Sequence, residues 1–516
     1  MQHEVRHSSP GWASIGRPLY RSSDYSSLSR VGVVDVGSNS VRLVVFDGAA
    51  RSPAYFYNEK IMCALGAGLS ETGRLNPEGR VRALSALRRF AALAEGMNIA
   101  PLTTVATAAV RDAEDGQEFC AEVERETGVK IFIVDGEEEA RLSAQGVLLG
   151  WPGSFGLVCD IGGSSMELAR LADGQVGARV TSSLGPLKLK GIKGGRKAVK
   201  AHIRETMEGL HERLGRPTNM RLFLVGGSWR AIARIDMERR HYPMRVLHEY
   251  RMTSRQVTRT RDYIKVVGVD ELRARLGFSQ ERAALLNEAS LVLASLVRTF
   301  RPKDIAVSSY GIREGMLFEE MPQEMRDRDP LIEACRFAEA KDARLPGFGD
   351  RLYGFVKPLF KRADWQKERI IHAACLLHDV SWRAHPDYRP EVSFENVTRA
   401  NLGGLKHRER VYLGLALLHR YTNKREGTPY ANLFDLIEPG EAAEATVLGK
   451  AMRLGAMLWL GADRQPGQLT FRSRKGELQL DLTAEAEPLF GEVADARFRS
   501  LASALNATPI VRFASG

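Results

Sequence analysis

Two short segments of the sequence carry the same pattern of residues suited to phosphate chemistry. Residues 35–40 read Asp-Val-Gly-Ser-Asn-Ser and residues 160–165 read Asp-Ile-Gly-Gly-Ser-Ser. Glycine lets a ligand approach the backbone closely, and successive free N–H groups form a cradle for an anion. An aspartate just before such a turn, here Asp35 or Asp160, can hold Mg²⁺ directly or through water. The pattern predicts a phosphate site, and the matched second copy argues against two ordinary hairpins.

A run of acidic residues precedes the second turn. Asp135, Glu137, Glu138 and Glu139 follow a predicted strand and open a predicted helix. The helix dipole favours acidic residues in the first helical turn, and this explanation is sufficient on its own. A phosphoryl-transfer site, however, also needs one carboxylate that positions or deprotonates water. The residues alone leave both interpretations open.

A basic stretch follows the second turn, in a chain whose formal net charge is +11. Residues 186–200 contain no acid, and their cations are Lys188, Lys190, Lys193, Arg196, Lys197 and Lys200. Such point charges can hold a phosphate polymer, in a manner that weakens with salt. A solvated helix face is the alternative. Aromatic residues do not interleave the cations, so specific recognition of nucleic acid by base stacking is not supported.

The elements around these motifs alternate between strands and helices, which indicates an α/β architecture. A strand–turn–strand unit is expected over residues 31–46 and again over residues 155–170. Its repetition one domain length later predicts two similar domains that face each other. The other expected elements are helices over 78–97 and 115–127, strands over 103–108 and 130–134, and glycine-rich strand ends at 222–228 and 305–311.

The composition changes near residue 321, where a polar, proline-containing segment predicts a linker. The chain is then expected to be helical to about residue 463, with a hairpin over 468–482 that turns at Lys475-Gly476. The predicted organisation is a loose segment over 1–30, α/β domains over 31–142 and 143–321, a helical domain over 322–463 and a small mixed domain over 464–516.

Composition also bounds the class of protein. With 516 residues, 44% hydrophobic and 27% charged, the chain is typical of a soluble protein with several domains. Its longest apolar runs fall short of a membrane span, so no transmembrane segment is expected, and residues 1–30 lack the apolar core of a secretory signal. Five scattered cysteines without a CxxC motif favour a reducing compartment. We therefore expect a cytoplasmic protein, and the basic charge leaves peripheral membrane association open.

Six motifs together resemble the exopolyphosphatase / guanosine pentaphosphate phosphohydrolase (Ppx/GppA) family. In chain order they read DVGSNSVRL, ATAAVRDA, DGEEEAR, DIGGSSMEL, VGGSWRAIARI and SSYGIREGML. The resemblance covers residues 31–319 most strongly. It implies two actin-like domains of the ribonuclease H-like fold (the ASKHA superfamily), followed in long members by an all-helical HD-like domain and a small α+β domain.

The resemblance also implies roles for individual residues. Glu139 corresponds to the catalytic base, while Asp160, Glu167 and Asp35 correspond to a Mg²⁺ site. Arg313 and Glu314 could face the cleft or form an interdomain ion pair, and both readings stay open. The implied phosphate contacts are Gly37, Ser38, Asn39, Ser40, Arg111, Gly162, Gly163, Ser164 and Ser165, and the implied nucleotide- or substrate-facing loop is Gly226, Gly227 and Ser228.

The helical domain contains His378-Asp379, which looks like an HD signature. Working HD hydrolases also use an upstream histidine, and the one candidate, His372, is offset by six residues. On a helix that offset places the two side chains on different faces. We therefore expect a degenerate HD fold without catalysis, which would extend the substrate channel or a dimer interface.

The function implied by the resemblance is exopolyphosphatase activity, in which the terminal phosphoanhydride bond of inorganic polyphosphate is hydrolysed with Mg²⁺. Hydrolysis of guanosine pentaphosphate at the same site is the main alternative. A non-catalytic sensor of polyphosphate or nucleotide, and a kinase of the same superfamily, are further alternatives. The resemblance suggests a homodimer.

Overall fold

The computed structural model describes residues 19, 29–47, 51–215, 220–423, 428–459 and 466–513. Nearly all of the segment predicted to be loose, 1–30, lies outside the described residues. The chain divides into two compact units, residues 1–327 and 328–516. Each unit is described by itself.

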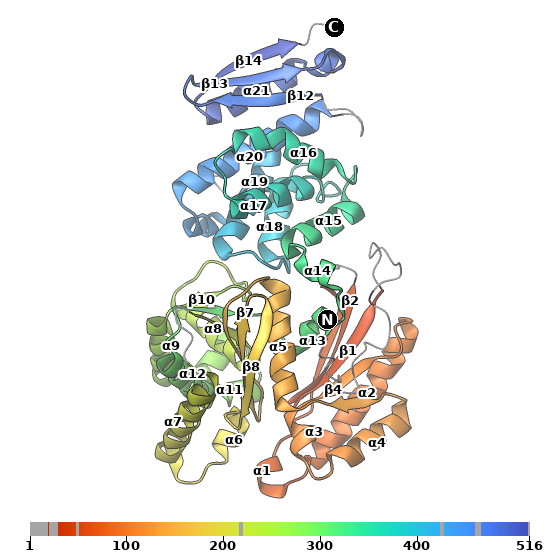
Figure 1. The fold of residues 1–516 in the computed structure, drawn as a ribbon, viewed down its shortest axis with the longest axis vertical. Coiled ribbons are helices and arrows are strands. Elements are labelled where there is room, and N and C mark those ends of the chain that lie inside the picture. The colour runs from red at the N-terminus through yellow and green to blue at the C-terminus, as the bar shows by residue number, and fades with distance from the viewer. Residues whose placement is uncertain are drawn as a thin grey trace, which may run out of the picture. The chain divides into compact units, whose positions relative to one another are not determined.

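The first sheet of the first unit contains the first copy of the predicted strand–turn–strand repeat. Its order is β3-β2-β1-β4-β5, with β1, β2 and β3 antiparallel and with β4 and β5 parallel to β1 (Figure 1). The strands are β1 (Val31–Val36), β2 (Ser40–Asp47), β3 (Ala54–Met62), β4 (Thr103–Ala106) and β5 (Ile131–Ile133). The helices of this domain are α1 (Leu69–Thr72), α2 (Pro77–Gly96), α3 (Ala108–Asp112) and α4 (Gly116–Thr127).

The second sheet has the order β10-β11-β9-β6-β7-β8. Its strands are β6 (Gly156–Ile161), β7 (Met166–Ala172), β8 (Gln175–Ser182), β9 (Arg221–Val225), β10 (Arg251–Met252) and β11 (Asp304–Val307). The accompanying helices are α6 (Pro186–Lys190), α7 (Gly195–Leu214), α8 (Gly227–Arg239), α9 (Ser254–Val267), α10 (Val269–Leu276), α11 (Gln280–Ala283) and α12 (Leu286–Phe300). The β6–β7 hairpin repeats the β1–β2 hairpin, as the sequence repeat predicts.

Two helices pack together between the sheets. In Figure 1, α5 (Gly136–Gly150) runs between them, and α13 (Ile312–Glu320) packs against it. The contact depends on two glycines, because a Cβ on Gly146 would lie 2.2 Å from the carbonyl oxygen of Gly311, and one on Gly315 would lie 1.7 Å from that of Leu142. The predicted boundary between residues 142 and 143 falls inside α5.

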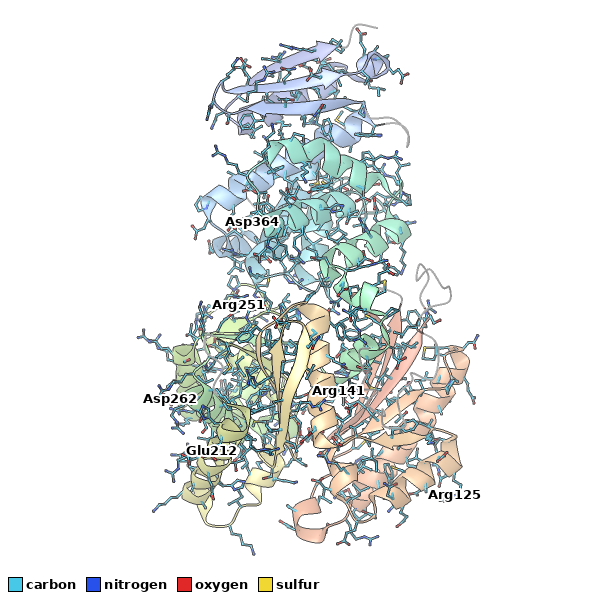
Figure 2. All side chains as sticks on the ribbon, viewed as in Figure 1. Arg125, Arg141, Glu212, Arg251, Asp262 and Asp364 are labelled. Carbon is cyan, nitrogen blue, oxygen red and sulfur yellow. The ribbon has the colours of Figure 1, made fainter. Side chains whose placement is uncertain are left out.

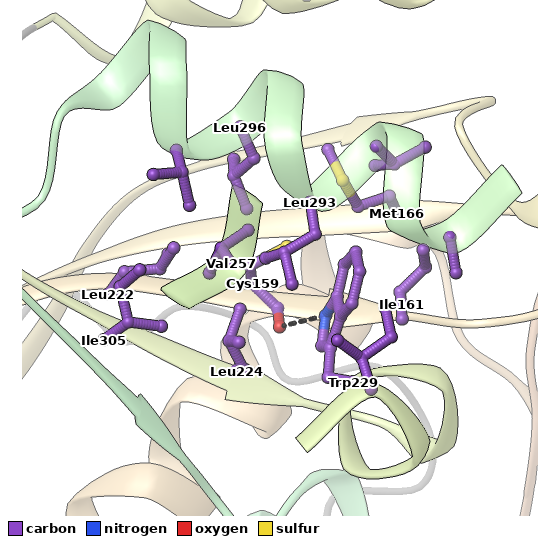
Figure 3. Close-up of a cluster of buried hydrophobic side chains, with 14 of the residues drawn as sticks. Cys159, Ile161, Met166, Leu222, Leu224, Trp229, Val257, Leu293, Leu296 and Ile305 are labelled. Atoms are coloured by element: carbon purple, nitrogen blue, oxygen red, sulfur yellow. Dashed lines mark hydrogen bonds between the residues drawn. The ribbon is translucent and has the colours of Figure 1, made fainter. Parts of the chain in front are cut away.

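The core of the second sheet's domain forms around Trp229, which is fully buried (Figure 3). The indole N–H of Trp229 donates to the carbonyl oxygen of Cys159 at 3.2 Å, so the polar atom of this large side chain is satisfied. Because Trp229 stands in the first turn of α8, this bond fixes the start of α8 against β6, next to the two glycine-rich strand ends.

One described stretch, Gln280–Phe300, is apolar and long enough by composition to cross a membrane. It comprises α11 and α12, and Leu286, Leu293 and Phe300 are buried in the same core. Such burial is what a core helix of a domain shows.

The second unit begins with helices, as predicted. They are α15 (Pro330–Asp342), α16 (Phe348–Val356), α17 (Trp365–Leu377), α18 (Arg389–Arg399), α19 (His407–Tyr421) and α20 (Pro439–Leu458), while α14 (Gln323–Asp327) ends the first unit. A small sheet follows, with the order β12-β13-β14 and helix α21 (Glu492–Ala504). The predicted hairpin is β12 (Gly467–Arg472) and β13 (Glu477–Leu482), and β14 (Thr508–Phe513) pairs parallel to β13.

Candidate functional site

A polar pocket of about 180 Å³ lies between the two sheets of the first unit. Both repeated turns, the Gly226 loop and the start of α13 contribute to its lining. The predicted site residues among the described lining are Asp35, Gly37, Ser38, Asn39, Ser40, Glu139, Asp160, Gly162, Gly163, Ser165, Gly226, Gly227, Ser228 and Arg313.

The two turns have the same backbone geometry. In the first, the N–H of Gly37 donates to the carbonyl oxygen of Ser40 at 3.0 Å, and in the second the N–H of Gly162 donates to that of Ser165 at 3.1 Å. The strand registers also match, since Asp35 pairs with Arg42 as Asp160 pairs with Glu167. The sequence repeat therefore corresponds to two hairpins with matching registers and turn hydrogen bonds, and both turns line the pocket.

Glu139 stands in the first turn of α5, which Asp135 caps by accepting a hydrogen bond from the N–H of Glu138 at 2.8 Å. Its side chain is buried, and burial together with the charges of Glu167 and Asp160 raises its pKa well above the ordinary range. The Arg111 guanidinium donates to Glu139 at 3.3 Å and to the carbonyl oxygen of Val134 at 3.0 Å. Arg111 thus holds the carboxylate in place, although it does not line the pocket.

Three further carboxylates surround Glu139. Burial raises the pKa of Asp35 and of Asp160, and the Ser143 hydroxyl donates to Asp160. Burial also raises the pKa of Glu167, whose Oε1 accepts a hydrogen bond from the Thr181 hydroxyl at 3.1 Å. The other oxygen of Glu167 is buried and accepts no hydrogen bond from the part of the chain that the structure describes. Four carboxylates gathered in this way, two of them buried and two half-buried, favour a positively charged ligand.

The donor set fits Mg²⁺ by chemistry, because it consists of oxygen ligands. Among the described residues, no three His, Cys, Asp or Glu side chains lie close enough to hold a metal ion by themselves. Mg²⁺ usually takes only one or two carboxylates, together with water and substrate phosphate. Asp160 and Asp35, which line the pocket, are the residues that would hold it, with Glu167 buried behind them.

Five cations line the same pocket: Arg42, Lys60, Arg230, Arg282 and Arg313. Burial, then the charges of Arg282, Arg42 and Arg230, lowers the pKa of Lys60 to about 8. Arg313 is buried, and among the described residues its Nε and Nη1 have no hydrogen-bond partner. Cations that repel one another, with N–H groups left unpaired, indicate a polyanionic ligand.

The predicted residues Arg313 and Glu314 have different surroundings. Arg313 lines the pocket, whereas Glu314 is fully buried and binds elsewhere. The Glu314 carboxylate accepts a hydrogen bond from the Tyr55 hydroxyl at 2.8 Å and another from the N–H of Gly311 at 2.8 Å. Glu314 therefore links α13 to β3 of the first sheet, and Tyr55 was not among the predicted residues.

A second link across the first unit involves Arg141 of α5, labelled in Figure 2. It forms ion pairs with Glu138 and with Glu319 of α13, both at 2.7 Å. The opposite charges hold α5 and α13 together beside the pocket.

The predicted basic stretch does not line the pocket. Lys188 forms an ion pair with Asp112 of α3 at 2.8 Å. The remaining cations named for polyanion contact are exposed on α6, α7 and the intervening loop: Lys190, Lys193, Arg196 and Lys197. Their contact with polyanion stays a prediction. The stretch is anchored to the site, because the N–H of Leu187 donates to the carbonyl oxygen of Gly163 at 2.8 Å.

Sequence reasoning did not identify four of the five cations that line the pocket. Arg42 had a signal, since the repeat places it opposite Glu167, and Arg230 stands within one quoted motif. Lys60 and Arg282 lie on β3 and α11, which carry no repeated pattern.

In the second unit, the HD-like residues His378 and Asp379 both have hydrogen-bond partners within the unit. Arg344 donates to both oxygens of Asp379, at 2.8 and 2.6 Å, and the Nδ1 of His378 contacts the carbonyl oxygen of Cys375 at 2.9 Å. His372 lies instead against Asp350, at 2.6 Å. These partners agree with the different helix faces expected for the two histidines, and the lack of catalysis there stays a prediction.

Comparison with known proteins finds relatives for both units. The profile of the Ppx/GppA phosphatase family matches residues 44–324, and that of the exopolyphosphatase C-terminal domain matches residues 362–508. Retrograde regulation protein 2 of Saccharomyces cerevisiae is 26% identical over 438 residues, which are 76% of this chain and 72% of that protein. Exopolyphosphatase 1 of Mycobacterium tuberculosis is 34% identical over 163 residues, which are 31% of this chain and 47% of that protein.

Solved structures show the same fold. A crystal structure described as an exopolyphosphatase from Cytophaga hutchinsonii matches with a TM-score of 0.52 at 23% identity, over 57% of this chain and 98% of that chain. The Ppx/GppA family member of Aquifex aeolicus matches with a TM-score of 0.50 at 23% identity, over the same shares. At this identity the similarity establishes the actin-like fold of the matched part.

Proposed function

The chain belongs to the Ppx/GppA phosphatase family, and from that premise we propose that it is an exopolyphosphatase. Its substrate would be inorganic polyphosphate, from which it releases terminal orthophosphate. The observation that carries the proposal is a pocket with carboxylates around Glu139 and five cations along the same lining. Among the described lining residues none is aromatic, which favours a chain of phosphates over a stacked nucleobase.

The proposed reaction is a direct in-line displacement. Glu139 orients a water molecule and accepts its proton as the oxygen attacks the terminal phosphorus, and its raised pKa makes it a stronger base once it is ionised. The bond from phosphorus to the bridging oxygen breaks, and the shortened polymer leaves with the electron pair. The N–H groups of both turns and the guanidinium of Arg313 stabilise the charge on the phosphoryl oxygens.

Mg²⁺, when bound at Asp160 and Asp35, would supply further positive charge to the phosphoryl oxygens. Arg111 keeps Glu139 in position, and the Ser143 hydroxyl keeps Asp160 in position. No covalent intermediate with the protein is required.

The test is phosphate release from long-chain polyphosphate and from guanosine pentaphosphate, measured side by side with and without Mg²⁺. We expect metal-dependent release mainly from polyphosphate. Release mainly from the nucleotide would reassign the chain to pentaphosphate hydrolysis at the same site.

A regulatory function without turnover is the second candidate, supported by the similarity to retrograde regulation protein 2 over 76% of this chain. A pure sensor has no need of the buried base Glu139. Tight binding of polyphosphate with release from neither substrate would favour the sensor.

A further inference from the structure

His248 lies behind the pocket and does not line it. The residue precedes β10, and its ring is buried, with 2% of its surface exposed. It contacts two parts of the first unit: the loop before α13 and the C-terminal end of α5.

The first contact is with Ser309, which does line the pocket. The N–H of Ser309 donates to the Nδ1 of His248 at 3.3 Å, so this ring nitrogen acts as an acceptor. The carbonyl oxygen of Ser309 in turn accepts a hydrogen bond from the Nη1 of Arg230 at 3.1 Å. Ser309 therefore connects His248 to one of the pocket's cations.

The neighbouring residues hold the rest of this loop. The Ser308 hydroxyl donates to the carbonyl oxygen of Tyr310 at 2.8 Å and accepts from the N–H of Tyr310 at 3.1 Å. The N–H of Ser308 donates to the carbonyl oxygen of Leu224 in β9 at 2.8 Å. These bonds hold the residues on both sides of Ser309. The bond to His248 is a further contact, which orients the N–H of Ser309.

The second contact is with Trp151, the residue that caps α5. The His248 ring stacks on the indole with centroids 4.2 Å apart and planes inclined by 17°, and the Tyr310 ring lies 4.9 Å away. The packing is tight, because a Cβ on Gly150 would lie 3.1 Å from His248. The orientation of the His248 ring is thus fixed at the C-terminal end of α5, and Glu139 lies in the first turn of the same helix.

We propose that His248 is a positioning residue, which acts through Ser309 to hold the Arg230 guanidinium in the pocket and keeps this loop in register with α5. A phenylalanine could reproduce the stacking, but it could not accept the hydrogen bond from Ser309. An asparagine would keep an acceptor near the position of Nδ1 and lose the ring. The inference rests on the proposed function to the extent that Arg230 binds phosphate.

The test is a double-mutant cycle between His248→Phe and Arg230→Ala in the full chain. The KM and kcat for polyphosphate hydrolysis and the Kd for tripolyphosphate by calorimetry are measured for each protein. We expect His248→Phe to raise KM and Kd about 10-fold with a smaller effect on kcat, which is the effect of one lost buried hydrogen bond. In the Arg230→Ala background the same change should alter them less than about twofold, and His248→Asn should restore most of the affinity.

The matched control is His211→Phe, which replaces a ring packed against Phe300 in the same domain. It should leave KM and Kd unchanged. Equal effects of His248→Phe in both backgrounds, or a loss of thermal stability alone, would overturn the proposal. Should His248→Phe fail to fold, His248→Asn and His248→Ala replace it, and equal Kd values for these two would overturn the proposal as well.

The two measurements separate this inference from the proposed function. A wild-type protein that binds tripolyphosphate without hydrolysing polyphosphate overturns the enzymatic function and leaves the Kd cycle to decide the role of His248. A wild-type protein that does neither overturns both.

Discussion

The Ser164 hydroxyl donates a hydrogen bond to the Ser38 hydroxyl at 3.1 Å, and both side chains are buried. The two serines belong to the two repeated turns, one from each sheet. The repeated hairpins therefore meet at their tips, where both turns also line the pocket. Ser38 accepts this hydrogen bond, so its own O–H can still be donated to phosphate, whereas the Ser164 hydroxyl hydrogen is used in the contact between the turns.

Glu139→Gln should abolish most turnover, because the amide keeps the shape of the side chain and cannot accept the proton from water. We expect kcat to fall by roughly 10²- to 10⁴-fold with substrate affinity largely retained. Glu137→Gln, an exposed change in the same helical turn, is the matched control and should be silent. Initial rates of phosphate release decide the matter, and near-normal turnover of Glu139→Gln would refute its role.

Glu167→Gln should stabilise the metal-free protein increasingly as the pH rises. The folded-state pKa of Glu167 is raised by burial, so the native state holds a proton that the unfolded state releases above its ordinary pKa of about 4.3. Wild-type stability therefore falls as the pH rises from that value towards the folded pKa, whereas glutamine does not titrate. We expect the Tm difference to be near zero at pH 4 and about 2–4 °C in favour of the variant at pH 9.

Thermal melts in the presence of a chelator measure this difference. Glu137→Gln again serves as the control and should give a difference that does not change with pH. If the Tm of Glu167→Gln changes with pH in the same way as the Tm of the wild type, this result would contradict the raised pKa of Glu167.

The sequence predicted the parts of the fold and the site that depend on local pattern. The predicted helix over 78–97 is α2, displaced by one residue at each end, and the repeated turns form matching hairpins because glycine and β-branched residues specify them locally. Lys60 and Arg282 were not predicted, because packing brings them together from separate elements. The predicted boundary at 142/143 was placed within a helix, since α5 packs against both sheets and its sequence carries no break.

Affinity for polyphosphate should fall as the pH rises through about 8, because the pKa of Lys60 is about 8 in the free protein. Below about pH 8 the Lys60 amine is charged. Above about pH 8 it is mostly neutral in the free protein, so substrate binding requires the uptake of a proton. Lys60→Met should raise KM about 10-fold at pH 7 and remove this pH dependence. Lys130→Met, an exposed change in the same domain, is the control. A KM profile that keeps its rise near pH 8 in Lys60→Met would assign that rise to another group.

The exposed basic stretch should matter for long polymers only. We expect the triple change of Lys190, Lys193 and Lys197 to glutamine to weaken binding of long-chain polyphosphate and to reduce its salt dependence, with little effect on tripolyphosphate, because these side chains lie outside the pocket. The control removes the same charge from helices α9 and α10 of the same domain, by changing the exposed Arg255, Arg259 and Arg273 to glutamine. Equal salt slopes for the two triple variants would show that the stretch is an ordinary solvated surface.

Gly146→Ala should separate α5 from α13 and so damage both stability and activity. Its Cβ would lie 2.2 Å from the carbonyl oxygen of Gly311, a backbone atom that cannot yield without moving the start of α13 and with it Arg313. We expect a loss of about 1–3 kcal/mol in the free energy of unfolding, as for other overpacked sites, and a lower kcat/KM. Gly209→Ala is the matched control, since this glycine lies within α7 and its Cβ would meet open space. Denaturant unfolding should show that Gly209→Ala is neutral or stabilising by about 0.5–1 kcal/mol, and an equal response of the two variants would mean that the helix contact tolerates a methyl group.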